Sequence, residues 1–223
     1  MARRFFTPTD LERISQAVKE AERKTSGEIV PYFVDQSDSY DEAAWRGGAL
    51  FAAAALVGIA ILHLTSDTWH GWGPTEIAII SLGAIGLGII MTHRIPLLKR
   101  LLAGNELLEL RVAQRAAQAF ISEEVFKTRD RTGILLFLSI LEHKVLVVGD
   151  SGISARVAQA EWEDVVEAVT RGIRNGKPAE GFVEAIRKCG VLLEKKGVRR
   201  RRADRNELAN KLRVGRKPGR KSS

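Results

Sequence analysis

The chain has 223 residues, with 35 Lys or Arg against 27 Asp or Glu, which gives a formal net charge of +8 at pH 7. The excess belongs to residues 197–223, which hold 11 basic and two acidic residues, so the rest is close to neutral. This distribution argues against a nucleic-acid-binding surface on the body of the protein. The single cysteine, Cys189, excludes an internal disulfide.

The first segment predicts a helix followed by a strand. Thr7 is a suitable N-cap, Pro8 fits the first helical position, and Asp10 stands where a capping acid would. Residues 28–34 then form an apolar run that predicts a strand. Because Pro31 has no N–H to donate, this strand should lie at a sheet edge or be bulged there.

Two apolar runs, residues 47–64 and 75–93, contain no Lys or Arg. At about 18 residues each, a helix spans roughly 27 Å, close to the hydrocarbon thickness of a bilayer. A soluble helix of this length would show a polar stripe, which both runs lack. The runs therefore predict a transmembrane hairpin at residues 47–93, and the alternative is a pair of buried core helices.

Basic residues flank the hairpin on one side only. The loop at 65–74 has no Lys or Arg but contains Trp69 and Trp72, whereas the outer flanks carry Arg46, Arg94, Lys99 and Arg100. The positive-inside rule then predicts a multi-pass protein of the bacterial inner membrane with both termini in the cytoplasm. Residues 1–46 and 94–196 thus lie on the same side and can form one domain.

The second half predicts helices around two strands. A helical region at 96–126, interrupted near Gly104, precedes a strand at 133–140 that is apolar throughout and should be buried on both faces. A second strand at 144–148 returns as a hairpin partner, and two amphipathic helices follow, at 158–174 and 178–196. The fold class is α/β, an α+β sandwich with a small mixed sheet flanked by helices and interrupted by the hairpin.

Residues 197–223 form a polybasic segment, which is predicted to be disordered because it is a block of like charge with few apolar side chains. A short helical turn at residues 206–214 is the alternative within it. Held near a cytoplasmic membrane face, the polybasic segment would bind anionic lipids. Nucleic-acid binding through phosphates and a simple solubilising role are the alternatives. Because no aromatic residues are interleaved with the charges, base stacking is disfavoured.

The turn at residues 149–152, Gly-Asp-Ser-Gly, is the main candidate site. Its backbone amides could hold an anion, or Asp150 could bind Ca²⁺ or Mg²⁺ together with Asp130, and with Asp35 or Asp38 from neighbouring loops. The competing interpretation is that these are turns selected for backbone geometry. No catalytic residue can be named from the sequence.

Several segments together resemble the TPM domain family, named for a thylakoid lumen protein, a photosystem II repair protein and a nicotinic-receptor modulator. The segments are FTPTDLERISQAVKEAERKTSGEIVPYFV at 6–34, AAQAF at 116–120, TRDRTGILLFLSILEHKVLVVGDSGI at 128–153, Trp162, and GIRNGKPAEGFVEAI at 172–186. The resemblance implies a role in assembly or repair of membrane complexes, with a phosphatase-like activity or divalent-cation binding in some members. It places Asp130 and Asp150 nearest the family's acidic and glycine turns.

Two functions follow as hypotheses. The first is a non-enzymatic accessory or assembly and quality factor for a membrane-protein complex, with an unknown membrane-protein partner. The second is a divalent-metal-dependent phosphatase-like hydrolase, although such sites usually bring several carboxylates together and only Asp130 and Asp150 are well placed. A third, weaker hypothesis is a nucleic-acid-binding protein that acts through the basic segment.

Overall fold

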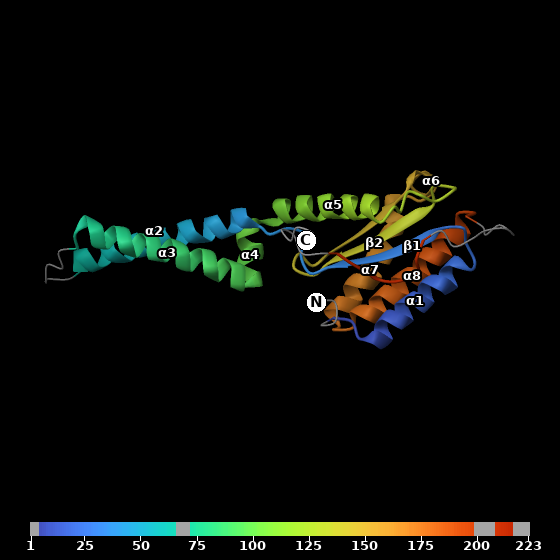
Figure 1. Ribbon diagram of the computed structural model, residues 1–223, viewed down its shortest axis with the longest axis horizontal. Helices are drawn as coiled ribbons and strands as arrows, with labels where there is room; N and C mark the ends of the chain where they lie inside the picture. The colour runs from blue at the N-terminus through green and yellow to red at the C-terminus, as the bar shows by residue number, and fades with distance from the viewer. Residues whose placement is uncertain (1–4, 66–71, 199–207, 216–223) are drawn as a thin grey trace, which may run out of the picture. The chain divides into compact units, whose positions relative to one another are not determined.

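The computed structural model describes residues 5–65, 72–198 and 208–215. The predicted interfacial Trp69 and most of the polybasic segment lie outside these ranges. The chain divides into two compact units (Figure 1). Residues 1–38 and 110–223 form the first unit, and residues 39–109, inserted between them, form the second.

The first unit is built on a four-stranded mixed sheet with the order β3-β2-β1-β4. Its strands are β1 (Glu28–Val34), β2 (Gly133–Ser139), β3 (Lys144–Gly149) and β4 (Arg213–Val214). β2 pairs with β1 in parallel, with Glu28 opposite Gly133, and with β3 in an antiparallel hairpin. The predicted α/β class with a small mixed sheet is confirmed.

Both faces of β2 are covered, as its continuous apolar sequence predicts, because all seven residues are buried. One face packs against α1 (Pro8–Glu22), α7 (Gln159–Arg174) and α8 (Pro178–Lys195). The other face packs against α5 (Asn105–Ser122), whose small and branched side chains Val112, Ala116 and Ala119 are buried. The helices therefore hold the sheet in a three-layer arrangement that leaves the ends of the strands accessible to loops.

The first helix begins as its sequence predicts. Thr7 and Asp10 form a capping box: the Thr7 side chain accepts from Asp10 N, and the Asp10 carboxylate accepts from Thr7 N at 3.0 Å. Phe6, just before the cap, is buried and packs edge-on against Phe33 with ring centroids 5.2 Å apart. The cap therefore fixes α1 against the strand that follows it.

Pro31 lies in β1 on the side that faces away from β2. Ile29 N donates to Glu22, and Phe33 O accepts from Gly215 N, so odd-numbered residues of β1 direct their backbone polar groups away from β2. On that side β4 pairs only with Tyr32 and Phe33. The predicted edge position or bulge is therefore wrong, because β1 lies between β2 and β4 in an unbroken register. Pro31 is accommodated because β4 does not extend to pair with it, so that Pro31 costs the sheet no hydrogen bond.

The prediction of a wholly disordered segment from residue 197 onward is wrong for residues 208–215. Leu212 is buried in the core, Arg213 and Val214 add the strand β4 beside β1, and Arg213 is ion-paired with Glu123. The physical reason is tertiary: an unpaired strand edge and a nearby carboxylate order a segment whose own composition favours disorder. We call residues 208–215 the strap.

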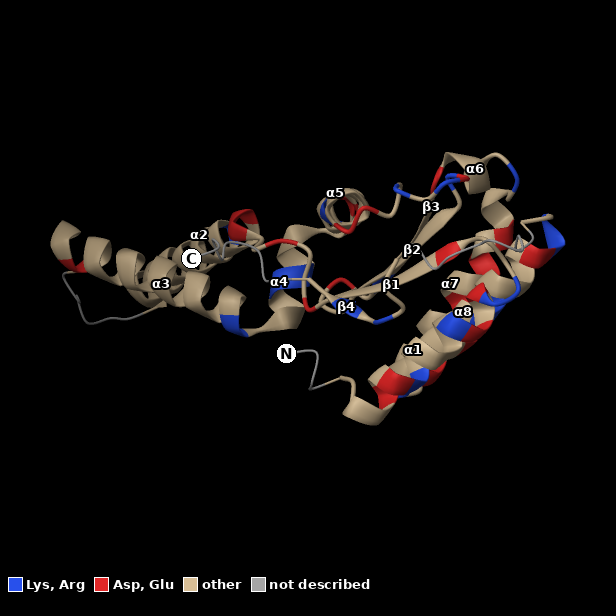
Figure 2. Cartoon of the chain, turned by 45° about the vertical axis from the view of Figure 1, so that its right-hand side comes forward, with Lys and Arg blue, Asp and Glu red and all other residues tan. Residues whose placement is uncertain are grey.

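The second unit contains α2 (Asp41–Thr65), α3 (Pro74–Arg94) and the short α4 (Pro96–Ala103). α2 and α3 are long and apolar enough to cross a membrane, and only 11% of the most apolar stretch of each is buried. Their exposure contradicts the alternative of buried core helices. Figure 2 shows them almost free of charged residues between their ends.

Glycines allow α2 and α3 to pack closely. A Cβ on Gly88 would lie 2.5 Å from Gly47 O and 2.9 Å from the Gly48 Cα, well inside van der Waals contact. Thr92 on α3 is fully buried at the same crossing and donates its hydroxyl to Gly88 O. Close backbone approach through small residues is a common basis of helix association in membranes.

Candidate functional site

The candidate site lies at the end of the sheet where β1 and β2 begin and β3 ends. Two segments meet there: the loop at 126–132, which precedes β2, and the Gly-Asp-Ser-Gly turn, which leads into the single-turn helix α6 (Ser151–Ser154). Asp150 N donates to Gly133 O at 2.9 Å, and Gly152 N donates to Arg131 O at 3.0 Å. These backbone hydrogen bonds join the two segments.

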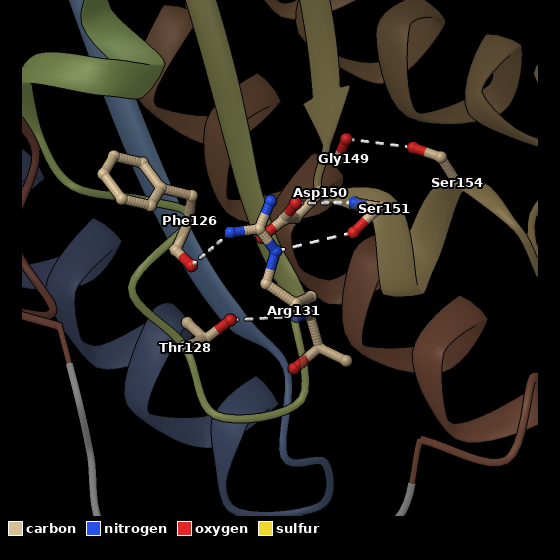
Figure 3. A network of polar contacts seen from close by, with 8 residues as sticks. Phe126, Thr128, Arg131, Gly149, Asp150, Ser151 and Ser154 are labelled. Carbon is tan, nitrogen blue, oxygen red and sulfur yellow. Dashed lines mark hydrogen bonds and ion pairs between the residues drawn. The ribbon is translucent and has the colours of Figure 1, made fainter.

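Arg131 and Asp150 form an ion pair at the centre of this site (Figure 3). The Asp150 side chain is only 4% exposed, and its Oδ2 lies 3.1 Å from Arg131 Nε. Its Oδ1 accepts from Ser151 N at 2.6 Å, which caps α6. Arg131 Nε donates to Ser151 Oγ, with the two atoms 3.5 Å apart. Among the described residues Asp150 Oδ2 has no hydrogen-bond partner, so its contact with Arg131 is one of charge rather than an aligned hydrogen bond.

The backbone of the 126–132 loop presents Arg131 in an unusual conformation. Arg131 has a φ of 55°, in the left-handed region that non-glycine residues seldom adopt. Two hydrogen bonds hold the loop, from Arg131 N to Thr128 O and from Thr132 N to Thr128 Oγ1. The guanidinium also lies 6.0 Å from the centre of the Phe126 ring, so its position is fixed on several sides.

Gly152 is required for the two segments to approach. A Cβ at this position would lie 2.4 Å from Asp130 O and 2.7 Å from Arg131 O. Both are backbone atoms that no side-chain rotation can move. The second glycine of the turn thus serves the contact between loops rather than a positive φ.

Comparison with known proteins identifies the second half of the chain. A family model of the TPM domain matches residues 102–191, a range that includes α5, β2, β3 and the candidate site. The chain contains a TPM domain. The match begins after the α2–α3 hairpin, but β1 pairs along its whole length with β2, so residues on both sides of the hairpin build the same sheet.

A solved structure shares the fold. The NMR structure of the BA42 protein from the psychrophilic bacterium Bizionia argentinensis is similar over 95% of this chain and 96% of that chain, with a TM-score of 0.57 and 19% sequence identity. No curated protein matches the chain. The structural likeness at this identity concerns the fold alone.

The fold keeps apart some of the acidic residues that the sequence analysis grouped as possible cation ligands. Asp130 and Asp150 do lie in adjoining segments, whereas Asp35 and Asp38 follow the far end of β1. A strand of seven residues is about 20 Å long, so Asp35 and Asp38 cannot share a cation with Asp150. Asp38 is instead paired with Arg111, with Nε and Oδ2 2.9 Å apart.

As arranged, the Asp150 side chain does not fit a divalent cation. A guanidinium already faces Oδ2, and a backbone amide occupies Oδ1. Hard cations need several oxygen ligands, and the described parts of the chain bring no three His, Cys, Asp or Glu side chains together as a cation site. The Ca²⁺ or Mg²⁺ site at Asp130 and Asp150 stays a prediction.

A pair of carboxyl groups at the same end of the sheet, of which Glu28 is buried and Glu22 partly buried, was not found from the sequence. Glu22, in the last turn of α1, accepts from Ile29 N at 2.9 Å and from the Asn210 side chain of the strap. Burial, and then the charge of Glu28, raises the pKa of Glu22 to about 8. Burial and the nearby Glu28 charge therefore favour the protonated form of the Glu22 carboxyl. The sequence gives little indication of this carboxyl pair, because Glu22 lies in a helix rich in charged residues.

Cys189 and Ser139 both have surroundings that assign them structural roles. Cys189 is fully buried, and burial raises the pKa of its thiol to about 12, which suits a core residue rather than a nucleophile. At the opposite end of the sheet, Ser139 is hydrogen-bonded to Glu142 and to Ser37, which joins the ends of β1 and β2. The Arg131–Asp150 pair thus remains the principal candidate site.

Proposed function

We propose that this protein is an integral membrane protein whose TPM domain lies in the cytoplasm and docks on another membrane protein as an accessory, assembly or quality factor. The observation that carries the proposal is the hairpin. α2 and α3 expose apolar side chains along lengths sufficient to cross a bilayer, and they are inserted between two parts of one domain. An apolar surface of this extent requires an apolar environment.

The charges beside the hairpin support the cytoplasmic orientation. Arg46, Arg94 and Arg100 lie near the ends that connect to the TPM domain, and the loop between α2 and α3 has neither Lys nor Arg. Positive residues remain preferentially on the cytoplasmic side of bacterial inner membranes. We therefore infer that both termini lie inside, and the insertion would give the domain two covalent connections to the membrane.

The site favours a binding role over turnover. Asp150 is buried and neutralised by Arg131, whereas a catalytic carboxylate must reach a substrate atom within hydrogen-bonding distance. In contrast, Arg131 is half exposed and held by its surroundings. A guanidinium oriented in this way suits recognition of a carboxylate or phosphate group on a partner.

The proposal is tested by cross-linking in intact membranes followed by purification of the full chain. We expect the protein to resist extraction by alkaline carbonate and to co-purify with a defined membrane protein. The Arg131→Met variant should stay in the membrane but lose the partner, while Arg129→Met in the same loop should keep it. Release of the wild-type protein by carbonate would refute the membrane assignment, and equal partner recovery with Arg131→Met would refute the docking role of the site.

A phosphatase-like hydrolase is the second candidate. It is supported by the meeting of Arg131, the Ser151 hydroxyl and Asp150 at an accessible end of the sheet. Hydrolysis of a phosphomonoester that falls sharply in both Asp130→Ala and Asp150→Ala, measured with and without Mg²⁺ or Ca²⁺, would establish it. Activity that neither change affects would remove these residues from the site.

For the polybasic segment we propose contact with anionic lipids. The hairpin would hold it near the cytoplasmic surface, where each basic residue contributes about 1 kcal/mol of attraction. Binding to vesicles that contain phosphatidylglycerol should weaken with salt and with truncation after residue 215, which keeps the strap. Salt-sensitive binding to RNA but not to such vesicles would favour the nucleic-acid reading.

A further inference from the structure

The helix α4 has an apolar face that the rest of its unit does not cover. Leu97 and Leu101, one helical turn apart, are 73% and 74% exposed. Lys99 and Ala103, on the other side of α4, are buried. The helix is therefore amphipathic with its apolar side outward, which is the reverse of a helix that packs only within a soluble unit.

α4 does not continue the span that precedes it. Ile95 has an extended backbone conformation, and Pro96 begins the new helix, so the chain changes direction between α3 and α4. Gly104, with a φ of 79°, then ends α4 after eight residues. Eight residues extend about 12 Å, which is too short to cross a bilayer.

Contacts with α2 fix α4 at the base of the hairpin. The Arg46 guanidinium donates to Leu102 O at 2.7 Å and to Ala103 O at 3.3 Å, and so satisfies carbonyl groups at the C-terminal end of α4. A Cβ on Gly47 would lie 3.2 Å from the Leu102 side chain, so the two helices are in close contact. α4 is thus a rigid part of the hairpin rather than a flexible linker.

The surroundings of α4 match the interface between lipid and water. Arg94 and Arg100 supply positive charge beside it, and Trp45, which is 66% exposed in the first turns of α2, precedes the Arg46 that binds α4. Trp and basic residues concentrate at the interfacial layer of membranes. Apolar exposure is also found on α3, just before α4 in the chain, where Ile90 is 57% exposed.

We propose that α4 is an interfacial helix that lies on the cytoplasmic leaflet, with Leu97 and Leu101 inserted at the boundary between headgroups and acyl chains. The inference rests on the proposed membrane insertion of α2 and α3. Its occupant is a lipid surface, because α4 directly follows a span whose apolar side chains are also exposed, and because its apolar face is flanked by cations that attract anionic headgroups. The helix then sets the depth at which the hairpin sits.

The test uses the full chain in vesicles of phosphatidylcholine and phosphatidylglycerol. An environment-sensitive dye is attached to Leu97→Cys or Leu101→Cys, and the native Cys189 is fully buried and does not compete for the dye. Nitroxide lipids labelled near the headgroup or deep in the acyl chain quench the dye according to its depth, and iodide quenches it from water. The control is Ile121→Cys on α5, where the native side chain is 65% exposed.

We expect shallow nitroxide to quench the dyes at 97 and 101 equally and iodide to reach neither, while the dye at 121 responds to iodide. A helix that continued the span would separate the two positions by roughly 6 Å in depth, so unequal depth overturns the proposal. Iodide quenching at 97 and 101 also overturns it. A dye at Leu82→Cys in the middle of α3 distinguishes failure of this inference from failure of the membrane insertion. If deep nitroxide quenches the dye at 82 while iodide reaches positions 97 and 101, only the interfacial position of α4 is refuted. If deep nitroxide does not quench the dye at 82, the membrane insertion of the hairpin is refuted as well.

Discussion

The Arg131–Asp150 pair predicts an asymmetric response to removal of its two partners. Replacing Arg131 with Met leaves a carboxylate that is only 4% exposed without its counter-charge, whereas replacing Asp150 with Asn leaves a guanidinium that is 52% exposed and can turn to water. At 3.1 Å the gross attraction is roughly 5 kcal/mol with an effective dielectric constant of about 20. The exposure of Arg131 lowers the net value.

We expect Arg131→Met to lower the free energy of unfolding by about 2–4 kcal/mol, close to the cost of an uncompensated buried charge. Asp150→Asn keeps an oxygen to cap α6 and should cost only about 1–2 kcal/mol. The double variant should resemble Asp150→Asn alone, because the Arg131 change does little once the carboxylate is gone. Arg129→Met in the same loop is the control and should change stability by less than about 0.5 kcal/mol.

Hydrogen exchange of the amides of the paired strands β2 and β3, in the detergent-solubilised full chain, measures this directly. These amides report unfolding of the TPM domain and not of the hairpin. If Arg131→Met proved no more costly than Asp150→Asn, the ion pair would not be what neutralises Asp150. The interpretation of the site as a held guanidinium would then fail.

Three further predictions concern the carboxyl pair, the hairpin and the strap. Because the pKa of Glu22 in the folded protein is raised to about 8, its contribution to stability is present below its unfolded pKa and is lost as pH rises toward 8. Glu22→Gln should remove this loss when the free energy of unfolding is measured at pH 5 and at pH 8. An unchanged difference between the two pH values would contradict the prediction. Gly88→Leu should separate α2 from α3 and destabilise the hairpin by about 1–3 kcal/mol in SDS titrations, whereas Gly83→Leu, with nothing within 4 Å of its Cβ, should not. Leu212→Asp should release the strap and abolish exchange protection of the Gly215 amide, unlike Val214→Asp at a half-exposed position; retained protection would show that β4 does not depend on Leu212.

The parts of the fold that the sequence predicted are those with local signals. The spans follow from uninterrupted apolar runs, β2 from seven apolar residues in a row, and the start of α1 from its capping box. The strap could not be predicted in this way, because its order comes from the open edge of β1 and from Glu123, far away in sequence. Composition alone describes such a segment as disordered.

The site was predicted only in part for a similar reason. Asp150 was chosen for its turn, but its partner Arg131 lies 19 residues earlier and meets it only through the β2–β3 hairpin. Grouping Asp35 with Asp150 failed because Asp35 follows β1 and Asp150 follows β3, which runs antiparallel to β2 and therefore ends at the opposite end of the sheet from β1. The Glu22–Glu28 pair forms only because the turn between α1 and β1 folds one element back on the other. No residue pattern in the sequence predicts that contact.

The central claim, a TPM domain held in the cytoplasm by a membrane hairpin, is tested most directly by thiol labelling of intact cells. Trp72→Cys lies between the spans and Lys211→Cys in the strap, and both native side chains are exposed, whereas Cys189 is buried. A membrane-impermeant maleimide should label position 72 in intact cells and position 211 only after permeabilisation. Labelling of position 211 in intact cells would contradict the account.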